Sequence, residues 1–483
     1  MPLLRLHSKY NPHKEAEQFA ATIDGHPFII VITEPGESYL AAVLKKKFPQ
    51  TKCIAIRYTD SLFLDSDALW DIVWRPSRGS LPFFLLSHIA DERLASTRFL
   101  SWKAADKAFP QEATAIWQEI RHAIELLTSV MRTRSFFGNR WLTNTFHNFT
   151  RLSNAAAIGF GTRDFILAGA GPSLQQLTAV HTGPYSIVAV SSAYHALATR
   201  NINTHLCLST DAGYWALRLF DGIPPDIPIA FPLEAAIPAS ILEHNPCIPL
   251  SYGSPLETAL FTASGLVPLT ARENGTVTGT ACELLLMHTT QKIVLAGVDL
   301  TASKGFIHAQ PHPSELRNDS RTDRFHPLAQ SLAVQNFHSQ SLETYRQWFL
   351  QLPSKQTRRL FRAGTGGCAL PNIRAIDLGA AIPNKTAGAA LSIQPSSAAS
   401  GAERIKITAA LLRRIRGDLA TLITDAPESL TGDTVSLEKQ ICALCSYTAY
   451  CNFIKTPFDT ETQLKLQKQV DSTLGALIKR IAP

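Results

Sequence analysis

Short apolar runs alternate with amphipathic stretches over the first 300 residues, and this alternation predicts an α/β protein. The run Pro27–Thr33 predicts a buried strand, Ser38–Lys47 a helix, and Lys52–Tyr58 a second strand. Strand, helix and strand within about 35 residues form a βαβ unit. The apolar run Leu81–Ser87 predicts a further strand of the same N-terminal part.

A long helix is expected after this unit. Ile116, Ile120 and Ile124 recur at helical spacing and predict a helix from Glu112 to Arg134 that connects two α/β regions. The stretch Arg140–Leu152 either continues this helix or forms a second one.

The central part of the chain repeats the alternation. Its predicted strands are Asp164–Ala168, Tyr185–Val190, His205–Ser209, Ile227–Phe231 and Lys292–Ala296. Helices are expected between most of them, at Leu174–Val180, Ala193–Arg200 and Gly279–His288. Such alternation favours a mostly parallel sheet with helices on both faces. Ligands of these sheets bind beyond the carboxyl ends of the strands.

The C-terminal part differs in composition. Ile382–Gly401 is rich in Ala, Ser and Pro and predicts a linker. Three amphipathic helices are expected beyond it, at Ala402–Ile423, Val435–Ile454 and Thr460–Ile481. The predicted organisation is an N-terminal α/β domain with its connecting helix, a central α/β domain, a linker and a C-terminal helical domain, at residues 1–139, 140–385, 386–401 and 402–483.

Composition narrows the class of protein. The 483 residues are 45% hydrophobic and 18% charged, which is typical of a globular protein, and the net charge of +7 is spread along the chain. This mild excess does not favour nucleic acid as a partner. No apolar run is long enough for a membrane span, and the N-terminus lacks the pattern of a secretory signal. The eight scattered cysteines fit a reducing cytoplasm. Cys442, Cys445 and Cys451 are expected to be buried thiols, since a zinc site would need a fourth ligand.

The strongest chemical motif is the turn Gly169-Ala-Gly171-Pro172-Ser173, between a predicted strand and a predicted helix. Glycines permit a sharp turn and close approach to a ligand, and free N–H groups at a helix start attract anions, usually phosphate. Leu174 occupies the third glycine position of the dinucleotide fingerprint, and the Lys-Ser/Thr of a P-loop is absent. The motif therefore predicts phosphate recognition outside these two standard classes.

Two further motifs follow predicted strands. Asp211 ends the strand that begins at His205, where an acid can bind a metal, a ribose hydroxyl or an amine, or simply close a turn. Thr276 and Thr278 lie in Asn274–Gly279, just before a predicted helix. This segment predicts a second anion cradle or a well-capped helix start.

Histidines cluster after the last predicted central strand. Asp299 follows that strand, and His308, His312 and His326 lie in the loop beyond it. Histidine titrates near neutral pH, so His308 is the first candidate general base and His326 the second. The spacing of the histidines fits no standard zinc site. Residues 304–327 are expected to form an active-site lid or a mobile loop.

Taken in order, these motifs resemble a known domain. The set comprises Gly169–Leu174, Ser209–Asp211, Gly275–Gly279, Gly297–Leu300 with His308-Ala309, Trp348-Phe349 and Gly364–Gly367. It is similar to the domain shared by motility accessory factors and the archaeal 6-hydroxymethylpterin diphosphokinase, long known as a domain of unknown function, over residues 140–385. The resemblance implies a Rossmann-like domain related to the bacterial sialyltransferase fold. The N-terminal unit and helical tail are more similar to motility accessory factors than to the pterin kinase.

The resemblance also implies a function. Motility accessory factors are thought to transfer nonulosonic, sialic-acid-like sugars from a donor activated with cytidine monophosphate (CMP) to Ser or Thr of flagellin. By this resemblance Gly169, Gly171, Pro172 and Ser173 would hold the donor phosphate. Asp211, Thr276 and Thr278 would contact nucleotide or sugar, and Asp299, His308 and His326 would be catalytic.

The sequence departs from the family pattern at two places, and two alternative functions stay open. Gly297-Val-Asp299 replaces the commoner Gly-Gln-Asp. The N-terminal turn Glu34-Pro-Gly-Glu37 is not glycine-rich, so the N-terminal unit is expected to have no nucleotide site.

The first alternative function is transfer of pyrophosphate from ATP to a pterin alcohol, with magnesium held by Asp211 and Asp299. The second is a non-catalytic factor that binds flagellin. No cofactor besides the possible magnesium is expected.

Overall fold

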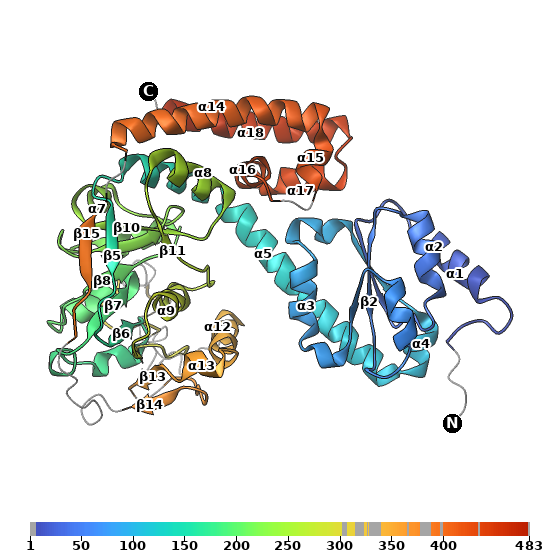
Figure 1. The fold of residues 1–483 in the computed structure, drawn as a ribbon, viewed down its shortest axis with the longest axis horizontal. Coiled ribbons are helices and arrows are strands. Elements are labelled where there is room, and N and C mark those ends of the chain that lie inside the picture. The colour runs from blue at the N-terminus through green and yellow to red at the C-terminus, as the bar shows by residue number, and fades with distance from the viewer. Residues whose placement is uncertain are drawn as a thin grey trace. The chain divides into compact units, whose positions relative to one another are not determined.

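The computed structural model describes residues 6–301, 307–313, 323–325, 327, 340–364, 367–376, 388–396, 399–432 and 435–481 (Figure 1). The chain forms two compact units, each of which combines an earlier and a later segment. Unit 1 contains Met1–Asn139 and Arg416–Thr473, and unit 2 contains Arg140–Ile415 and Leu474–Pro483. The predicted long helix is one helix of 42 residues, α5 (Pro110–Arg151), so the boundary between the units falls inside it.

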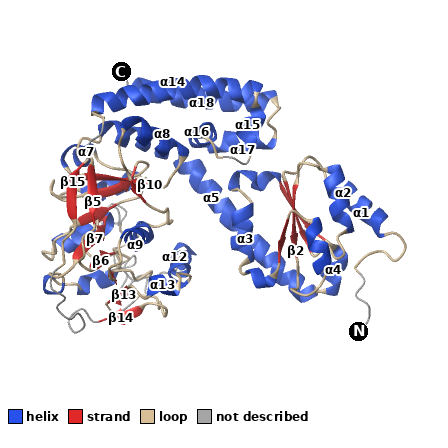
Figure 2. Cartoon of the chain, in the orientation of Figure 1, coloured by secondary structure: helices blue, strands red, loops and turns tan. Residues whose placement is uncertain are grey.

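Unit 1 is built on a four-stranded parallel sheet. Its strands are β1 (Ile29–Thr33), β2 (Lys52–Ile56), β3 (Ile72–Trp74) and β4 (Thr97–Ser101), in the order β3-β2-β1-β4. Its first helices are α1 (Pro12–Ala21), α2 (Tyr39–Lys47), α3 (Leu81–His88) and α4 (Lys103–Ala108), which lie on both sides of the sheet (Figure 2). The predicted βαβ unit is confirmed.

The strand predicted at Leu81–Ser87 is wrong, because this segment forms α3. The apolar run shows no periodicity that would distinguish a strand from a buried helix. Pro82 lies in the first turn of α3. Amides of the first turn have no hydrogen-bond partner within the helix, so a proline, which lacks the N–H, is tolerated there.

Protein side chains fill the carboxyl edge of the unit 1 sheet. The side chain of Arg57 follows β2 and is fully buried, 2.9 Å from the Glu34 carboxylate and 3.0 Å from that of Asp67. Its guanidinium also donates to the Gly36 carbonyl and the Ser66 hydroxyl. The guanidinium of Arg57 is thus bound by protein acceptors, and the expected lack of a nucleotide site in this unit stays a prediction.

The later segment of unit 1 packs on the earlier one through helices. The helices of the C-terminal part are α14 (Gly401–Asp425), α15 (Pro427–Thr431), α16 (Leu437–Cys445), α17 (Tyr447–Lys455) and α18 (Thr460–Ile481). The predicted helix Val435–Ile454 is two helices, α16 and α17, which are separated at Ser446. The Tyr447 hydroxyl donates to the buried carboxylate of Asp91. Cys442, Cys445 and Cys451 are buried free thiols, as predicted.

Unit 2 contains a nine-stranded parallel sheet. The strands lie in the order β11-β10-β9-β8-β7-β6-β12-β13-β14. Their bounds are β6 (Phe165–Ala168), β7 (Ser186–Val190), β8 (Leu206–Leu208), β9 (Ile229–Pro232), β10 (Cys247–Ser251), β11 (Leu269–Thr270), β12 (Ile293–Ala296), β13 (Leu360–Ala363) and β14 (Arg374–Ile376). All five predicted central strands are confirmed. β6, β7 and β12 are buried along their whole length, as expected for a sheet covered on both faces.

Helices and one added pair of strands complete unit 2. The α-helices are α6 (Tyr194–Ala198), α7 (Ala239–His244), α8 (Pro255–Ser264), α9 (Val277–His288), α12 (Gln340–Leu350) and α13 (Ser354–Thr357). The predicted helix Leu174–Val180 is wrong: Pro172–Gln176 and Ala179–His181 are short 3-10 turns. Part of the predicted linker is β15 (Ser392–Pro395), which pairs antiparallel with β5 (Ala156–Gly159). β15 has the sequence Ser392-Ile-Gln-Pro395, which is too short to show an alternating apolar pattern.

The strand order reverses between β6 and β12. From β6 the chain adds strands outward to β11, and then returns to place β12 on the other side of β6. Such a reversal opens a crevice at the carboxyl ends of the two strands, where ligands of α/β sheets bind. The glycine turn after β6 and the Gly297–Asp299 segment after β12 meet at this position. No helix among the described residues has the length and apolarity to cross a membrane.

Candidate functional site

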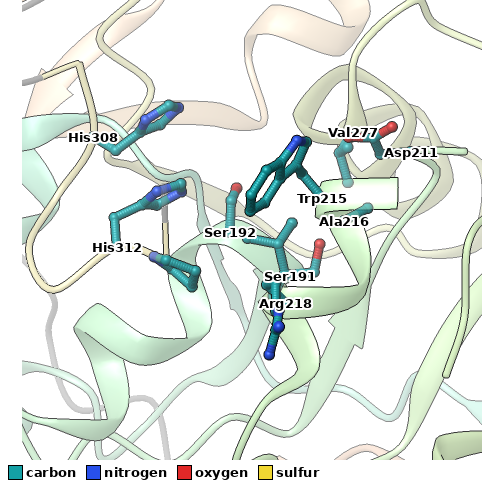
Figure 3. A pocket seen from close by; sticks show the side chains of 11 residues that line it. Ser191, Ser192, Asp211, Trp215, Ala216, Arg218, Val277, His308 and His312 are labelled. Atoms are coloured by element: carbon teal, nitrogen blue, oxygen red, sulfur yellow. The ribbon is translucent and has the colours of Figure 1, made fainter. Parts of the chain in front are cut away.

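A pocket of about 270 Å³ lies at the carboxyl edge of the unit 2 sheet, over β7 and β8 (Figure 3). It is lined by Ser191, Ser192, Asp211, Trp215, Ala216, Arg218, Leu219, Val277, His308, His312 and Pro313. These residues come from the ends of two strands, from the start of α9 and from the loop beyond β12. The pocket therefore unites Asp211 and His308, two of the residues predicted from sequence, with the start of the helix that follows Thr276.

The imidazoles of His308 and His312 stack in parallel on one side of the pocket. Their ring centroids are 4.1 Å apart and their planes differ by 8°. Burial lowers the pKa of His308, and burial together with the neighbouring His308 and His195 lowers the pKa of His312 to about 3. Both rings are therefore neutral at neutral pH. A neutral imidazole can accept a proton, which a general base at position 308 requires.

Asp211 and the two threonines lie at the pocket with different roles in the fold. The Asp211 Oδ1 accepts a hydrogen bond of 2.7 Å from the Gly213 amide, so one carboxylate oxygen closes a turn while the side chain stays exposed. Thr276 is the N-cap of α9, and its hydroxyl accepts a hydrogen bond of 2.8 Å from the Gly279 amide. Thr276 and Thr278 flank Val277, which lines the pocket. Thr276 thus has the capping role that the sequence left open, and a ligand contact of either threonine stays a prediction.

Trp215 and Arg218 are among the pocket residues that the sequence motifs did not indicate. Trp215 and Arg218 belong to the 3-10 helix Tyr214–Phe220, directly after the Asp211 turn. The Trp215 side chain is 51% exposed, and its indole lies between the histidine pair and Asp211 (Figure 3). Arg218 extends away from the histidines. An aromatic residue four positions after a strand-end acid is the signal that could have revealed Trp215.

The glycine turn after β6 differs from the expected phosphate cradle. The Gly171 amide donates to the Gly297 carbonyl at 2.7 Å, the Ser173 amide to Asp299 Oδ2 at 2.6 Å, and the Leu174 amide to the Gly171 carbonyl. Pro172 has no N–H, and Gly169 donates to the Ala296 carbonyl. The expectation of unpaired amides is therefore wrong for Gly169, Gly171, Ser173 and Leu174. The α-helix that would have added its dipole is a 3-10 turn.

The glycines allow the backbone after β6 to approach the backbone after β12 closely. A Cβ on Gly171 would lie 2.6 Å from the Gly297 carbonyl oxygen, and one on Gly169 would lie 2.7 Å from the same atom. Gly297 itself has a φ of +67°. We call residues 169–174 together with 297–299 the β6–β12 junction. Here the amide and the hydroxyl of Ser173 donate to the carboxylate of Asp299.

Asp299 does not join the pocket. Its side chain is 3% exposed, its two oxygens accept from the amide and hydroxyl of Ser173, and Arg362 lies 3.7 Å away. The residues that line the pocket include Asp211 but not Asp299. Asp211 thus lines the pocket and Asp299 does not, and a magnesium ion shared by the two carboxylates stays a prediction. His326, like most of the predicted 304–327 lid, lies outside the described residues.

Unit 2 is thus an α/β unit with a parallel sheet and a pocket at the carboxyl edge of that sheet, the edge at which ligands of such sheets bind. Residues 139–305 match the family described as 6-hydroxymethylpterin diphosphokinase MptE-like, in agreement with the resemblance that the motifs indicated.

A relative and a solved structure extend the comparison. An uncharacterised protein of Treponema pallidum (strain Nichols) is 40% identical over 298 residues, which are 62% of this chain and 66% of that protein. The solved structure of the MAf glycosyltransferase from Magnetospirillum magneticum AMB-1 is similar to the whole chain, with a TM-score of 0.56 and 12% identity, and 85% of that chain is covered. At this identity the likeness shows a shared fold.

Proposed function

We propose that this chain is a glycosyltransferase that moves a nonulosonic sugar from a CMP-activated donor to Ser or Thr hydroxyls of flagellin, in the cytoplasm. The observation that carries the proposal is the pocket over β7 and β8, which joins an aromatic face, an exposed carboxylate and a neutral histidine. The shared fold with a MAf glycosyltransferase supports the same reaction class.

The cytosine, ribose and phosphate of the donor each require a different kind of contact, and the pocket is lined by residues of different chemistry. The half-exposed indole of Trp215 offers a flat π face, which suits the planar, uncharged cytosine. The exposed carboxylate of Asp211 would accept from ribose hydroxyls. The N-terminal turn of α9, which begins at Val277, and Arg218 would offer positive charge for the phosphate. The nucleotide would thus lie across the ends of β7 and β8.

His308 would act on the acceptor. Its neutral imidazole takes the proton of the acceptor hydroxyl as that oxygen bonds to the anomeric carbon of the sugar. The bond between this carbon and the phosphate oxygen breaks, and CMP leaves with the electron pair. No step in this scheme requires Asp299.

The family description supports a second candidate, pyrophosphate transfer from ATP to a pterin alcohol. That reaction requires magnesium, which acidic oxygen ligands normally hold. Asp299 is bound to Ser173 and lies outside the pocket, so the expected Asp211–Asp299 pair does not fit the ion in this arrangement. The transferase is therefore ranked first.

A transfer assay separates the candidates. Purified protein is incubated with flagellin and CMP-nonulosonate, or with hydroxymethylpterin, ATP and magnesium, and products are read by mass spectrometry. We expect sugar on flagellin, and His308→Ala should lower the rate at least about tenfold. His244→Ala, an exposed histidine of α7, is the control and should leave the rate unchanged. Pterin diphosphate as the product, or binding of flagellin without any transfer, would contradict the proposal.

A further inference from the structure

The imidazoles of His308 and His312 pack in a way that suits one charged ring and one neutral ring. Their centroids are 4.1 Å apart and their planes differ by 8°. Two uncharged aromatic rings repel when their faces meet squarely, and such pairs usually lie offset or edge to face, with centroids about 4.5–7 Å apart. A cation over the face of a neutral aromatic ring is attracted to that face. The close, parallel stack therefore favours a state in which one imidazole carries a proton.

The loop that carries the two rings is held at the residues between them. The Ala309 amide donates to the Ala170 carbonyl at 2.7 Å. Ala309 is 1% exposed, so this hydrogen bond is shielded from water. The Gln310 carbonyl accepts from the Arg200 guanidinium at 3.0 Å. Because the backbone between the rings is fixed, the two side chains start from set positions, and the stack belongs to the fold of the loop.

His312 is the member of the pair that stays neutral. Burial, together with His308 and His195, lowers the pKa of His312 to about 3, whereas burial is the cause of the lowered pKa of His308. A proton that reaches the pair therefore goes to His308. Both imidazoles line the pocket (Figure 3), so His308 is within reach of a substrate that binds there.

A charged His308 needs a stabilising contact, because burial disfavours an imidazolium. A carboxylate often supplies such a contact in active sites. Here the Asp299 carboxylate is bound within the β6–β12 junction, and the indole of Trp215 lies between the Asp211 carboxylate and the histidine pair (Figure 3). The face of His312 is in direct contact with His308 and is therefore placed to stabilise its charge.

The cationic and titratable groups on the neighbouring elements act against this charge. They are His195 and Arg200 of α6 and Arg218 of the 3-10 helix Tyr214–Phe220. Arg200 binds the backbone of the loop, and Arg218 extends away from the histidines (Figure 3). A positive charge on any of them opposes a second one on His308, so the contact with a neutral ring gains in importance.

We propose that His312 is a positioning residue that acts through His308: its ring face orients the base and stabilises the positive charge that the base acquires during transfer. The inference rests on the proposed role of His308 as the base. The proton moves from the acceptor hydroxyl to a ring nitrogen of His308, while the acceptor oxygen bonds to the sugar and CMP leaves with the electron pair. His312 takes no proton in this step.

The first test is the pKa of His308 in the ligand-free protein. It is measured by NMR titration of isotope-labelled histidine, with His308→Ala to identify the signal. His312→Leu replaces the aromatic ring by an aliphatic side chain. Because the imidazolium then loses the π face, the pKa of His308 should fall by about 0.5–1.5 pH units.

Three further variants separate the ring from its polarity and its place. His312→Phe keeps an aromatic face and should hold the pKa of His308 within about 0.3 pH units of that in the unaltered protein. His312→Gln is polar but has no ring, and should lower this pKa as His312→Leu does. If one of the two ring-free variants fails to fold, the other decides. His244→Leu, at an exposed histidine of α7, is the control and should leave the pKa of His308 unchanged.

The second test is the pH profile of kcat/KM for sugar transfer, whose acid limb reports the pKa of the base in the free enzyme. In His312→Leu the acid limb should move to lower pH by the amount found in the titration, and the rate on the plateau should fall about threefold or more. His312→Phe should show neither change. A loss of rate with an unmoved acid limb would mean that His312 only packs the loop, and would overturn the proposal.

The titration decides the inference without the transfer assay. A pKa of His308 that is unchanged or raised in His312→Leu would overturn it, and so would an equal fall in His312→Phe, because the aromatic face would then have no effect. If the unaltered protein transfers no sugar, the proposed function fails, whereas a lowered pKa of His308 in His312→Leu would still support the stabilising contact.

Discussion

Gly171→Ala tests the steric basis of the β6–β12 junction. Gly171 has a φ of −66° and a ψ of 155°, a conformation that alanine adopts without strain. The effect of the added methyl group is therefore due to its surroundings. It would lie 2.6 Å from the Gly297 carbonyl oxygen and 2.7 Å from Asp299 Oδ2. The carbonyl oxygen belongs to the backbone of a neighbouring strand end, so it cannot rotate away as a flexible side chain would.

Two opposing contributions set the magnitude. Replacing glycine by alanine at a permissive conformation stabilises a protein by about 0.4–1 kcal/mol, because the unfolded chain loses freedom. Inserting a methyl group into a well-packed place costs about 1–3 kcal/mol. Since two atoms lie closer than a Cβ tolerates, we expect the cost to dominate, with a net loss of about 1–2 kcal/mol in the free energy of unfolding.

Chemical denaturation provides the measurement, and Gly183→Ala provides the control. Gly183 also lies in unit 2, and a Cβ there meets nothing within 4 Å. We expect this control to be neutral or up to about 1 kcal/mol more stable. Equal free energies of unfolding for the two variants would refute the close packing of Gly171 against Gly297 and Asp299.

Three further predictions concern the pocket, unit 1 and acid stability. Trp215→Ala should weaken CMP binding by at least about fivefold, because it removes a stacking contribution of about 1–3 kcal/mol, and Trp215→Phe should restore most of the affinity. Equal CMP affinities of the unaltered protein and Trp215→Ala would contradict stacking. Arg57→Met should lower the free energy of unfolding, measured by urea titration, by about 3–5 kcal/mol, because the buried Glu34 carboxylate loses its cationic partner. A change under about 1 kcal/mol would contradict this prediction. The pKa of His308 and His312 lies below the ordinary 6.5, so the unfolded chain binds protons first as the pH falls. Stability should be full above about pH 6.5. Below that pH, His312 should lower it by about 1.4 kcal/mol per pH unit toward pH 3, and His308 should add to the loss. His312→Gln should reduce the slope measured by denaturation at several pH values.

Strong hydrophobic patterns made most of the α/β core predictable. β6, β7 and β12 are continuous apolar runs, and the residues after them lie at one sheet edge because parallel strands end together. This reasoning correctly brought Asp211 and His308 to one pocket. The predicted strands omitted six strands of unit 2, which are β5, β10, β11, β13, β14 and β15. β11 has only two residues, and β15 has one aliphatic side chain, Ile393, so neither carries a period.

The glycine turn shows where sequence reasoning fails. The motif at residues 169–173 predicted a sharp turn that holds a ligand phosphate, and in the structure Ser173 of this turn donates to the Asp299 carboxylate. Its partner could not be predicted, because Asp299 lies 126 residues away from Ser173 along the chain and reaches it only through the strand order β6-β12. A buried carboxylate and a bound phosphate require the same amides, so the pattern alone does not distinguish them.

The most direct test of the account is a crystal structure of the protein with CMP. We predict nucleotide density over the ends of β7 and β8, with the cytosine against Trp215 and His308 close by, while Ser173 keeps its hydrogen bonds to Asp299. Density for the phosphate on the Gly169–Ser173 amides, with Asp299 displaced, would contradict it.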